Sequence, residues 1–244
     1  MVKCKWIVER EYLNYFKGIF IYLFMSEINL MARYPKSNRN KDLFQRISEK
    51  TETNRKIARM FEKEFFDGDR KYGYGGYSYN SKYFTGVVED MRDYYGLTSE
   101  SKVLDIGCAK GFMLFDFKKI IPGITIRGID ISNYAIENAI PEIKEYVNVG
   151  NVKNLSEFKD KEYDLVTAIT TVHNLNLEDC KQALREIERV GKNAFITVDA
   201  WKNEEEKERM HAWNLTALTY MHVDDWKALF DEVSYTGDYY WFTP

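Results

Sequence analysis

Side chains that can hold or transfer protons accompany the apolar runs in the second half of this 244-residue chain. Asp105 lies within one such run, Asp130 lies near the end of the next, and His173 and Asp199 follow later ones. Carboxylates accept hydrogen bonds from hydroxyl and ammonium groups, and a histidine can transfer a proton near neutral pH. If each run is a strand of an open α/β sheet, these residues lie at the edge where such sheets bind ligands.

The stretch VLDIGCAKG, residues 103–111, predicts a strand, a tight glycine turn and the start of a helix over 112–121. Gly107 and Gly111 let backbone amides approach a ligand closely, and the positive end of the helix favours negative charge. The stretch therefore predicts a loop that binds a cofactor carrying a carboxylate or a phosphate.

This loop resembles motif I of the class I S-adenosylmethionine (SAM)-dependent methyltransferases. Its spacing is G-x-A-x-G, with Ala109 in place of the usual middle glycine, whereas a dinucleotide-binding fold would show G-x-G-x-x-G. The resemblance implies that Asp105, Gly107, Cys108 and Gly111 line the methionine end of SAM.

Asp130 extends the predicted cofactor site toward the ribose. It lies near the carboxyl end of a second strand, 124–131, where a carboxylate can accept two hydrogen bonds from a ribose diol. Ile131 follows it directly. We expect both residues to contact the adenosine.

A third strand, 146–149, is followed by Asn151 and Val152, where the methyltransferase pattern usually has an acidic residue that accepts from the adenine amino group. Asn151 can accept through its carbonyl oxygen. We expect these two residues, and Thr170 after the fourth strand, to complete the cofactor site.

The elements that position these residues alternate regularly between strand and helix from Ser101 onward, which predicts a parallel sheet with right-handed crossovers. The expected fold is α/β, a Rossmann-like doubly wound and mostly parallel sheet with helices on both faces. A helical cap or lid region over residues 1–98 precedes a SAM-binding domain over 99–244. A last helix from Trp226 and a short hairpin over 233–242 would close the chain.

The segment 67–83 has four glycines and five tyrosines and follows a stretch, 53–66, with helical periodicity. Glycines supply hinges and tyrosines supply contact surface, which favours a lid that closes over a ligand. The alternative is a surface loop that packs on the cap. In the first case Tyr74 and Tyr77 would contact the methyl acceptor.

Only three histidines occur in the chain. His173, with Asp199, is the candidate for proton transfer, because both lie at carboxyl ends of strands. His211, Trp213 and His222 belong to an insertion after the fifth strand and are candidates for acceptor contacts.

Residues 31–60 carry nine lysines and arginines against three acids. Such a run either meets an anionic substrate or forms a solvated helix face. For residues 1–30, two interpretations remain open. They form an amphipathic helix, around 12–25, that packs on the body or on a second subunit of a homodimer, or they are a dispensable extension before Met31.

Composition indicates which classes of partner and which cell compartment to expect. The net charge of −3 gives no general attraction to nucleic acid. The run at 12–25 is interrupted by Lys17 and is too short for a membrane span. Three widely spaced cysteines argue against a disulfide scaffold and favour a cytoplasmic protein. We expect no metal ion, because only Asp199 stands ready as a carboxylate ligand near the predicted acceptor site.

These features together predict a SAM-dependent methyltransferase that methylates an oxygen or nitrogen of a small polar acceptor, such as a sugar, a nucleotide-linked compound or a natural-product intermediate. A SAM-binding but catalytically silent partner protein is the alternative. A nicotinamide-dependent oxidoreductase is disfavoured by Asp105 and by the altered glycine spacing.

Overall fold

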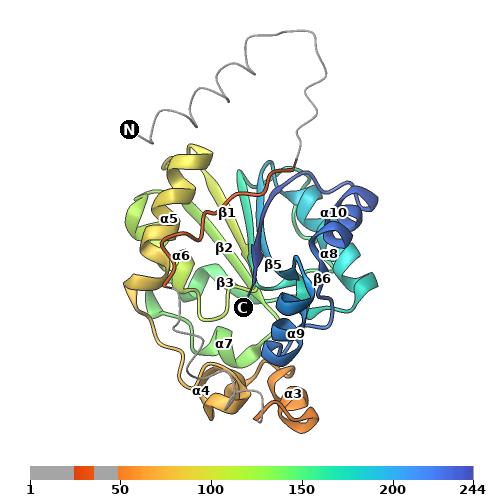
Figure 1. The fold of residues 1–244 in the computed structure, drawn as a ribbon. Helices are drawn as coiled ribbons and strands as arrows, with labels where there is room; N and C mark the ends of the chain where they lie inside the picture. Colours follow the sequence, from red (N-terminus) through yellow and green to blue (C-terminus); the bar gives the residue numbers. More distant parts are fainter. Residues whose placement is uncertain (1–24, 36–48, 244) are drawn as a thin grey trace.

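A parallel sheet in the order β3-β2-β1-β4-β5, with β6 and β7 both beside β5, carries the fold (Figure 1). The computed structural model describes residues 25–35 and 49–243. Every strand pair within the described residues is parallel. The strands are β1 (Lys102–Ile106), β2 (Thr125–Asp130), β3 (Val147–Val149), β4 (Leu165–Ile169), β5 (Ala194–Trp201), β6 (Met221–His222) and β7 (Asp238–Phe242).

Helices cover both faces of the sheet, which confirms the Rossmann-like α/β fold (Figure 1). Helices α5 and α6 share one apolar core with the sheet, and α8 and α10 share the other. The helices are α3 (Glu52–Ala58), α4 (Lys63–Asp67), α5 (Ser81–Tyr95), α6 (Phe112–Ile120), α7 (Asn133–Glu137), α8 (Leu177–Val190), α9 (Glu204–Trp213) and α10 (Val223–Glu232).

Side-chain periodicity explains the two cores. In β1, Val103 belongs to the core under α5 and α6, while its neighbour Leu104 belongs to the core under α8 and α10. A central parallel strand is buried on both faces in this way and reads as a continuous apolar run. In α8, Cys180, Leu184 and Ile187 repeat at helical spacing and are all buried. Cys180 is therefore a packing residue.

The expected hairpin at 233–242 is wrong. Residues 238–242 form one strand, β7, which runs parallel to β5 from the pair Phe195 and Asp238 to the pair Asp199 and Phe242. The chain reaches β7 from β5 by way of α10, and a helical crossover returns the chain in the same direction. The segment between α10 and β7 is too short to hold a second strand.

The N-terminal segment at 26–28 forms backbone hydrogen bonds with β7. Ile28 N donates to Tyr239 O at 2.9 Å, and Tyr239 N donates to Ser26 O at 3.0 Å. Leu30, with 5% of its surface exposed, packs in the core beside α5 and α6. Residues 25–30, part of the proposed dispensable extension, are thus packed on the body. Residues 1–24, with most of the expected helix at 12–25, lie outside the described residues.

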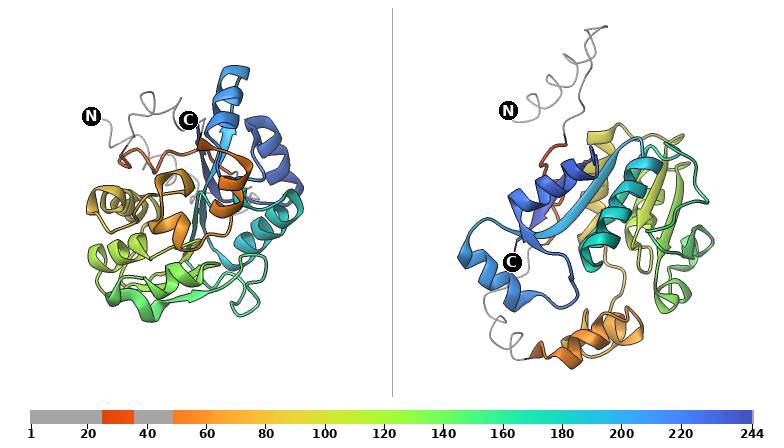
Figure 2. Two further views of the ribbon diagram at one scale, coloured as in Figure 1. Left: turned by 90° about the horizontal axis from the view of Figure 1, so that it is seen from below. Right: turned by 90° about the vertical axis from the view of Figure 1, so that its right-hand side faces the viewer.

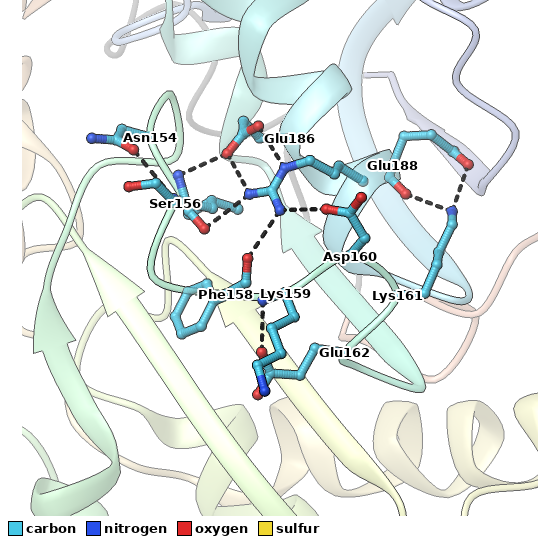
Figure 3. Close-up of polar contacts among 11 residues, drawn as sticks. Asn154, Ser156, Phe158, Lys159, Asp160, Lys161, Glu162, Glu186 and Glu188 are labelled. Atoms are coloured by element: carbon cyan, nitrogen blue, oxygen red, sulfur yellow. Dashed lines mark hydrogen bonds and ion pairs between the residues drawn. The ribbon is translucent and has the colours of Figure 1, made fainter.

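The connection from β3 to β4 is fastened to α8 by one arginine (Figure 3). Arg189 donates to both carboxylate oxygens of Glu186, at 2.9 Å each, and to Asp160 Oδ1 at 2.8 Å. Its guanidinium also donates to the carbonyl oxygens of Leu155 and Phe158. These contacts fix the segment that begins directly after Asn151.

The part of the cap that holds α3 and α4 lies beyond one end of the sheet, in front of the carboxyl ends of the strands (Figures 1 and 2). The single helix expected over 53–66 is two short helices, α3 and α4, because Phe61 adopts a left-handed conformation with φ of +52° between them. That turn places the Phe61 ring against Phe65, with the ring centroids 5.1 Å apart. Of the basic run at 31–60, residues 36–48 lie outside the described part. Within that part, no helix has the length and apolar character that a membrane crossing needs.

Candidate active site

A cavity of about 1000 Å³ lies between the cap and the carboxyl ends of β1, β4 and β5. It brings together residues that the sequence analysis assigned separately to the cofactor, the chemistry and the acceptor. Those on its wall are Asp105, Gly107, Cys108, Thr170, His173, Asp199, Tyr74, Tyr77 and Trp213.

The loop after β1 requires its two glycines. Gly107 and Gly111 have φ of +73° and +78°. A Cβ atom on Gly107 would lie 2.3 Å from Thr171 Oγ1, and one on Gly111 would lie 2.2 Å from Ile143 Cδ1. Ala109, with φ of +50°, adopts the left-handed conformation without being glycine. The loop is thus tight and closely packed, and at Gly107 a side chain would clash with Thr171.

Asp105 is a buried carboxylate on the cavity wall. Its Oδ1 accepts from Thr167 Oγ1 at 2.8 Å. Burial raises the pKa of Asp105 to about 7, and the nearby charge of Asp130 acts in the same direction, while the Thr167 hydroxyl opposes them. Because burial makes this carboxyl group costly to ionise, a cationic ligand group in the cavity would stabilise its charged form.

Asp130 lies behind the loop rather than on the wall of this cavity. Its Oδ2 accepts from Ala109 N at 2.8 Å, and its Oδ1 accepts from Ser132 N at 2.9 Å. Burial raises the pKa of Asp130, although both hydrogen bonds favour the charged form. Asp130 therefore also holds Ala109 in its left-handed conformation, a role that the sequence analysis did not anticipate.

The expected adenosine contacts divide into exposed and buried residues. Ile131, after β2, has 55% of its surface exposed, and Val149 at the end of the neighbouring β3, which the sequence analysis did not name, has 49% exposed. Asn151 is exposed, and its side-chain oxygen Oδ1 already accepts from Lys153 N at 3.0 Å. Val152 is buried in the core under α8 and α10. Ile131 and Val149 thus offer an apolar surface, while Val152 faces inward.

His173 is buried, and its proton position follows from one hydrogen bond. Asp199 N donates to His173 Nδ1 at 3.0 Å, so Nδ1 is an acceptor and the neutral ring carries its proton on Nε2. Burial lowers the pKa of His173, although the Asp199 carboxylate favours the charged form. The Asp199 carboxylate oxygen is 3.8 Å from Nδ1, which makes the backbone hydrogen bond the closer contact. His173 is therefore neutral at pH 7 and can donate from Nε2.

Thr170, after β4, has φ of +51°. A β-branched residue in this region is strained, and such strain persists where surrounding contacts enforce it. Thr170 N donates to Thr197 Oγ1 at 2.8 Å, and Thr170 O accepts from Asn174 Nδ2 at 3.0 Å. Ala109 and Thr170 thus place two strained backbone positions on the wall of one cavity, and such positions cluster at functional sites.

The tyrosine-glycine segment lines the cavity with a row of aromatic rings, and Tyr74 and Tyr77 also pack on Phe66 of α4, the contact with the cap that the alternative interpretation expected. The Tyr74 and Tyr77 ring centroids are 4.3 Å apart, and Tyr77 stacks on Phe112 at 4.7 Å. Tyr74 has 42% of its surface accessible, yet burial raises the pKa of its hydroxyl far above the usual value. Both observations hold if the accessible surface faces the cavity, since protein atoms then surround the hydroxyl.

Hydrogen bonds fasten this segment to the sheet domain. Asp67 accepts from Tyr77 N at 2.8 Å, from Tyr134 Oη at 2.7 Å and from Lys110 Nζ at 2.6 Å. At its other end, Tyr79 Oη donates to the buried carboxylate of Asp116. The segment is thus held over the cavity at both ends.

Two of the predicted acceptor contacts do not reach the cavity wall. His211 Nδ1 is 3.1 Å from Tyr220 Oη, and its ring lies beside Trp201. His222 precedes α10 and accepts from Asp224 N through Nδ1 at 3.2 Å, which caps the helix. Trp213, from the same insertion, does line the cavity.

Sequence reasoning missed several residues on or near this wall. Phe112 stacks under the lid, and Lys110 anchors it. Lys50 and Asn214 line the opposite part of the cavity. Sequence signals existed for Lys110, which is the one charged residue between the two glycines of the loop, and for Lys50, which belongs to the basic run at 31–60. Within the described residues, no three histidine, cysteine or acidic side chains gather as metal ligands would.

Comparisons with known proteins agree with this geometry at the level of the family. The family described as a methyltransferase domain matches residues 97–237. A comparison with curated protein sequences found no match.

Solved structures resemble the chain at low identity. The YcgJ protein from Bacillus subtilis is 21% identical, with a TM-score of 0.48, over 60% of this chain and 66% of that chain. A chain from a Haloferax volcanii complex of the Trm112 methyltransferase activator is 20% identical, with a TM-score of 0.46, over 61% and 72%. The geranyl diphosphate C-methyltransferase from Streptomyces coelicolor is 12% identical, with a TM-score of 0.48, over 59% of each chain. All three TM-scores are below 0.5, so the assignment rests on the family match.

Proposed function

The chain belongs to the methyltransferase-domain family of class I, SAM-dependent enzymes, and we propose that it transfers a methyl group from SAM to an oxygen or nitrogen of a small polar acceptor. One observation carries the proposal. A single cavity under the cap joins the loop with Asp105 and Gly107 to His173 and Asp199. The candidate cofactor-binding and proton-handling groups therefore face the same cavity.

The residues present fit the cofactor. Gly107 lies on the cavity wall without a side chain, so its backbone would let the methionine end approach closely, and the buried Asp105 carboxylate suits its ammonium group. Asp130 would accept from the ribose, and the exposed Ile131 and Val149 would contact the flat base. When bound, the cofactor supplies a methyl group on a positively charged sulfur.

The acceptor would be oriented by His173 and Asp199. The Nε2–H of His173 would donate a hydrogen bond to an acceptor oxygen and hold it in line, because an oxygen keeps a second lone pair for the methyl group. The Asp199 carboxylate, on the same wall, takes the proton that this atom releases. His173 acts as a donor because its other nitrogen is already used by Asp199 N.

The lid would exclude water from the reaction. Tyr74 and Tyr77 stack across the cavity, and their hydroxyls can bind a polar acceptor. Removal of water strengthens each hydrogen bond inside the site and prevents competing hydrolysis.

Calorimetric titration with S-adenosylhomocysteine (SAH) and with NAD tests the cofactor, and we expect saturable binding of SAH alone. A panel of hydroxyl- and amine-bearing acceptors, assayed for SAH formation, then separates an enzyme from a SAM-binding silent partner. Asp199→Asn should abolish turnover and leave SAH affinity unchanged. Tight NAD binding without SAH binding would overturn the proposal.

A further inference from the structure

Three basic side chains of the cap lie where the cap meets the loop after α9. Arg55 Nη1 donates to Asn214 O at 2.6 Å, and Arg59 Nε donates to Thr216 O at 3.2 Å. Arg55 Nε also donates to Lys50 O at 3.3 Å. Among the described residues, the two guanidinium groups thus bind neutral carbonyl oxygens and form no ion pair.

No carboxylate oxygen of the described residues lies within 4.0 Å of the charged nitrogens of Lys50, Arg55 or Arg59. Lys71 on the cavity wall differs, since its ammonium lies 3.5 Å from Asp69 Oδ2, whereas Arg70 and Lys82 on the same wall resemble Lys50 in having no ion pair among the described residues. Of these three cations only Lys50 lines the cavity, beside Glu49, while the Arg55 charge lies behind it. The basic run of the sequence thus contributes one cation to the cavity wall.

Lys50 is held in place within this cluster. Arg55 fixes its backbone carbonyl, and its ammonium lies 4.9 Å from the centroid of the Trp213 ring. Lys50 and Trp213 both line the cavity that contains His173 and Asp199. Burial lowers the pKa of Lys50 to about 8, and repulsion by Arg55 adds to this, while Asp199 opposes it.

A bound anion would compensate the positive charge of the Lys50 ammonium. Charge-assisted hydrogen bonds from ammonium to phosphate or carboxylate oxygens are about twice as strong as neutral ones. The nearby Arg55 charge would attract the same anion, and Trp213 offers an apolar face to the remainder of the ligand. The site is thus complementary to a molecule with one anionic end.

We propose, on the basis of the methyltransferase function above, that Lys50 binds a phosphate or carboxylate group of the methyl acceptor while the reacting oxygen or nitrogen faces His173 and Asp199. The acceptor is therefore an anion. Its negative group lies against the wall formed by Lys50 and Trp213, and its reacting atom lies deeper, toward the carboxyl ends of β4 and β5.

The test uses the full chain saturated with SAH and titrated by calorimetry with inorganic phosphate, pyrophosphate and citrate, with glycerol as the neutral control. We expect saturable binding of at least one anion and none of glycerol. Lys50→Gln should weaken anion binding by about ten-fold or more, while Lys50→Arg should keep it within about three-fold. Lys56→Gln, which removes an exposed lysine of α3, should change nothing.

Preference for phosphates over citrate would identify a phosphorylated acceptor, and the reverse would identify a carboxylate. Equal anion affinity in Lys50→Gln and in the unaltered chain would overturn the proposal. So would the absence of anion binding in a chain that binds SAH. Because SAH affinity is measured in the same samples, a failure of the methyltransferase assignment appears separately, as lost SAH binding.

Discussion

The Lys110 ammonium lies 2.6 Å from Asp67 Oδ2 and joins the cofactor loop to the cap. Lys110 also donates to Tyr77 O at 2.8 Å, and only 7% of its surface is exposed. Since Lys110 is part of the tight turn between Gly107 and Gly111, the lid and the cofactor loop share one set of hydrogen bonds. Order in one therefore depends on order in the other.

Lys110→Met should loosen the lid. Loss of a hydrogen bond to a charged group costs about 1.5–3 kcal/mol, and Asp67 would remain partly buried without its cation. We expect faster amide exchange at 67–79 and a lower free energy of unfolding in denaturant. Lys119→Met, an exposed position on α6, is the control. Unchanged exchange at 67–79 would show that Tyr134 and Tyr79 suffice to anchor the lid.

SAH affinity should fall as pH decreases through about 7, the pKa to which burial raises Asp105. The ammonium group of the ligand requires the ionised carboxylate, so affinity should decrease about ten-fold per pH unit well below that value. Titration calorimetry from pH 5 to 8.5 measures this, and Asp105→Asn should flatten the profile. A flat profile in the unaltered chain would place the ammonium elsewhere.

The same group makes the ligand-free protein more stable in weak acid. The folded pKa of Asp105 lies above the unfolded value of about 4, so its contribution to stability is complete below pH 4 and is lost as pH rises through 7. Asp67 behaves differently. Burial opposes its ionisation, but the hydrogen bonds of Lys110, Tyr134 and Tyr77 N outweigh this and lower its pKa. The lid anchor should therefore persist down to about pH 4.

Asp130→Ala should weaken SAH binding by about 1.5–3 kcal/mol, the range for charge-assisted hydrogen bonds. The structure adds a second effect, because Ala109 N and Ser132 N would lose their acceptor. We therefore expect a lower melting temperature as well. Asp130→Asn, which retains one acceptor oxygen, should lose less stability than affinity. Unchanged affinity in both variants would exclude Asp130 from the ribose site.

A chain that starts at Met31 should be less stable than one that starts at Met25. The shorter chain lacks the two hydrogen bonds with Tyr239 and the buried Leu30, and full burial of a leucine side chain contributes about 1.5–3 kcal/mol. Thermal unfolding of the two chains measures the difference. Equal melting temperatures would restore Met31 as the boundary of a dispensable segment.

Tyr74→Phe and Tyr77→Phe should reduce turnover without a change in melting temperature. Each change keeps the ring and its stacking and removes only a hydroxyl group. Both side chains line the cavity. Turnover with a defined acceptor and thermal unfolding are the two measurements. Normal turnover would mean that the rings cover the site without binding the acceptor.

The sequence by itself determined the strand and helix alternation, the loop at 103–111 and the positions of Asp105, His173 and Asp199 at the sheet edge. These features are local, because burial periodicity and turn chemistry depend on residues close in sequence. A parallel topology then follows from the helical crossovers, which place the carboxyl ends of the strands on one side. For this reason the approximate location of the site was predictable.

Only the tertiary structure decided which residues meet across long sequence separations. The Lys110–Asp67 pair, the hydrogen bond from Asp199 N that makes His173 a donor, and the place of Lys50 over Trp213 each join segments distant in sequence. No local pattern encodes such pairs. The same holds for His211 and His222, whose chemistry suits an acceptor site but whose side chains pack on Tyr220 and cap α10. Their roles depend on the direction in which α9 and α10 leave the sheet, and packing alone decides that direction.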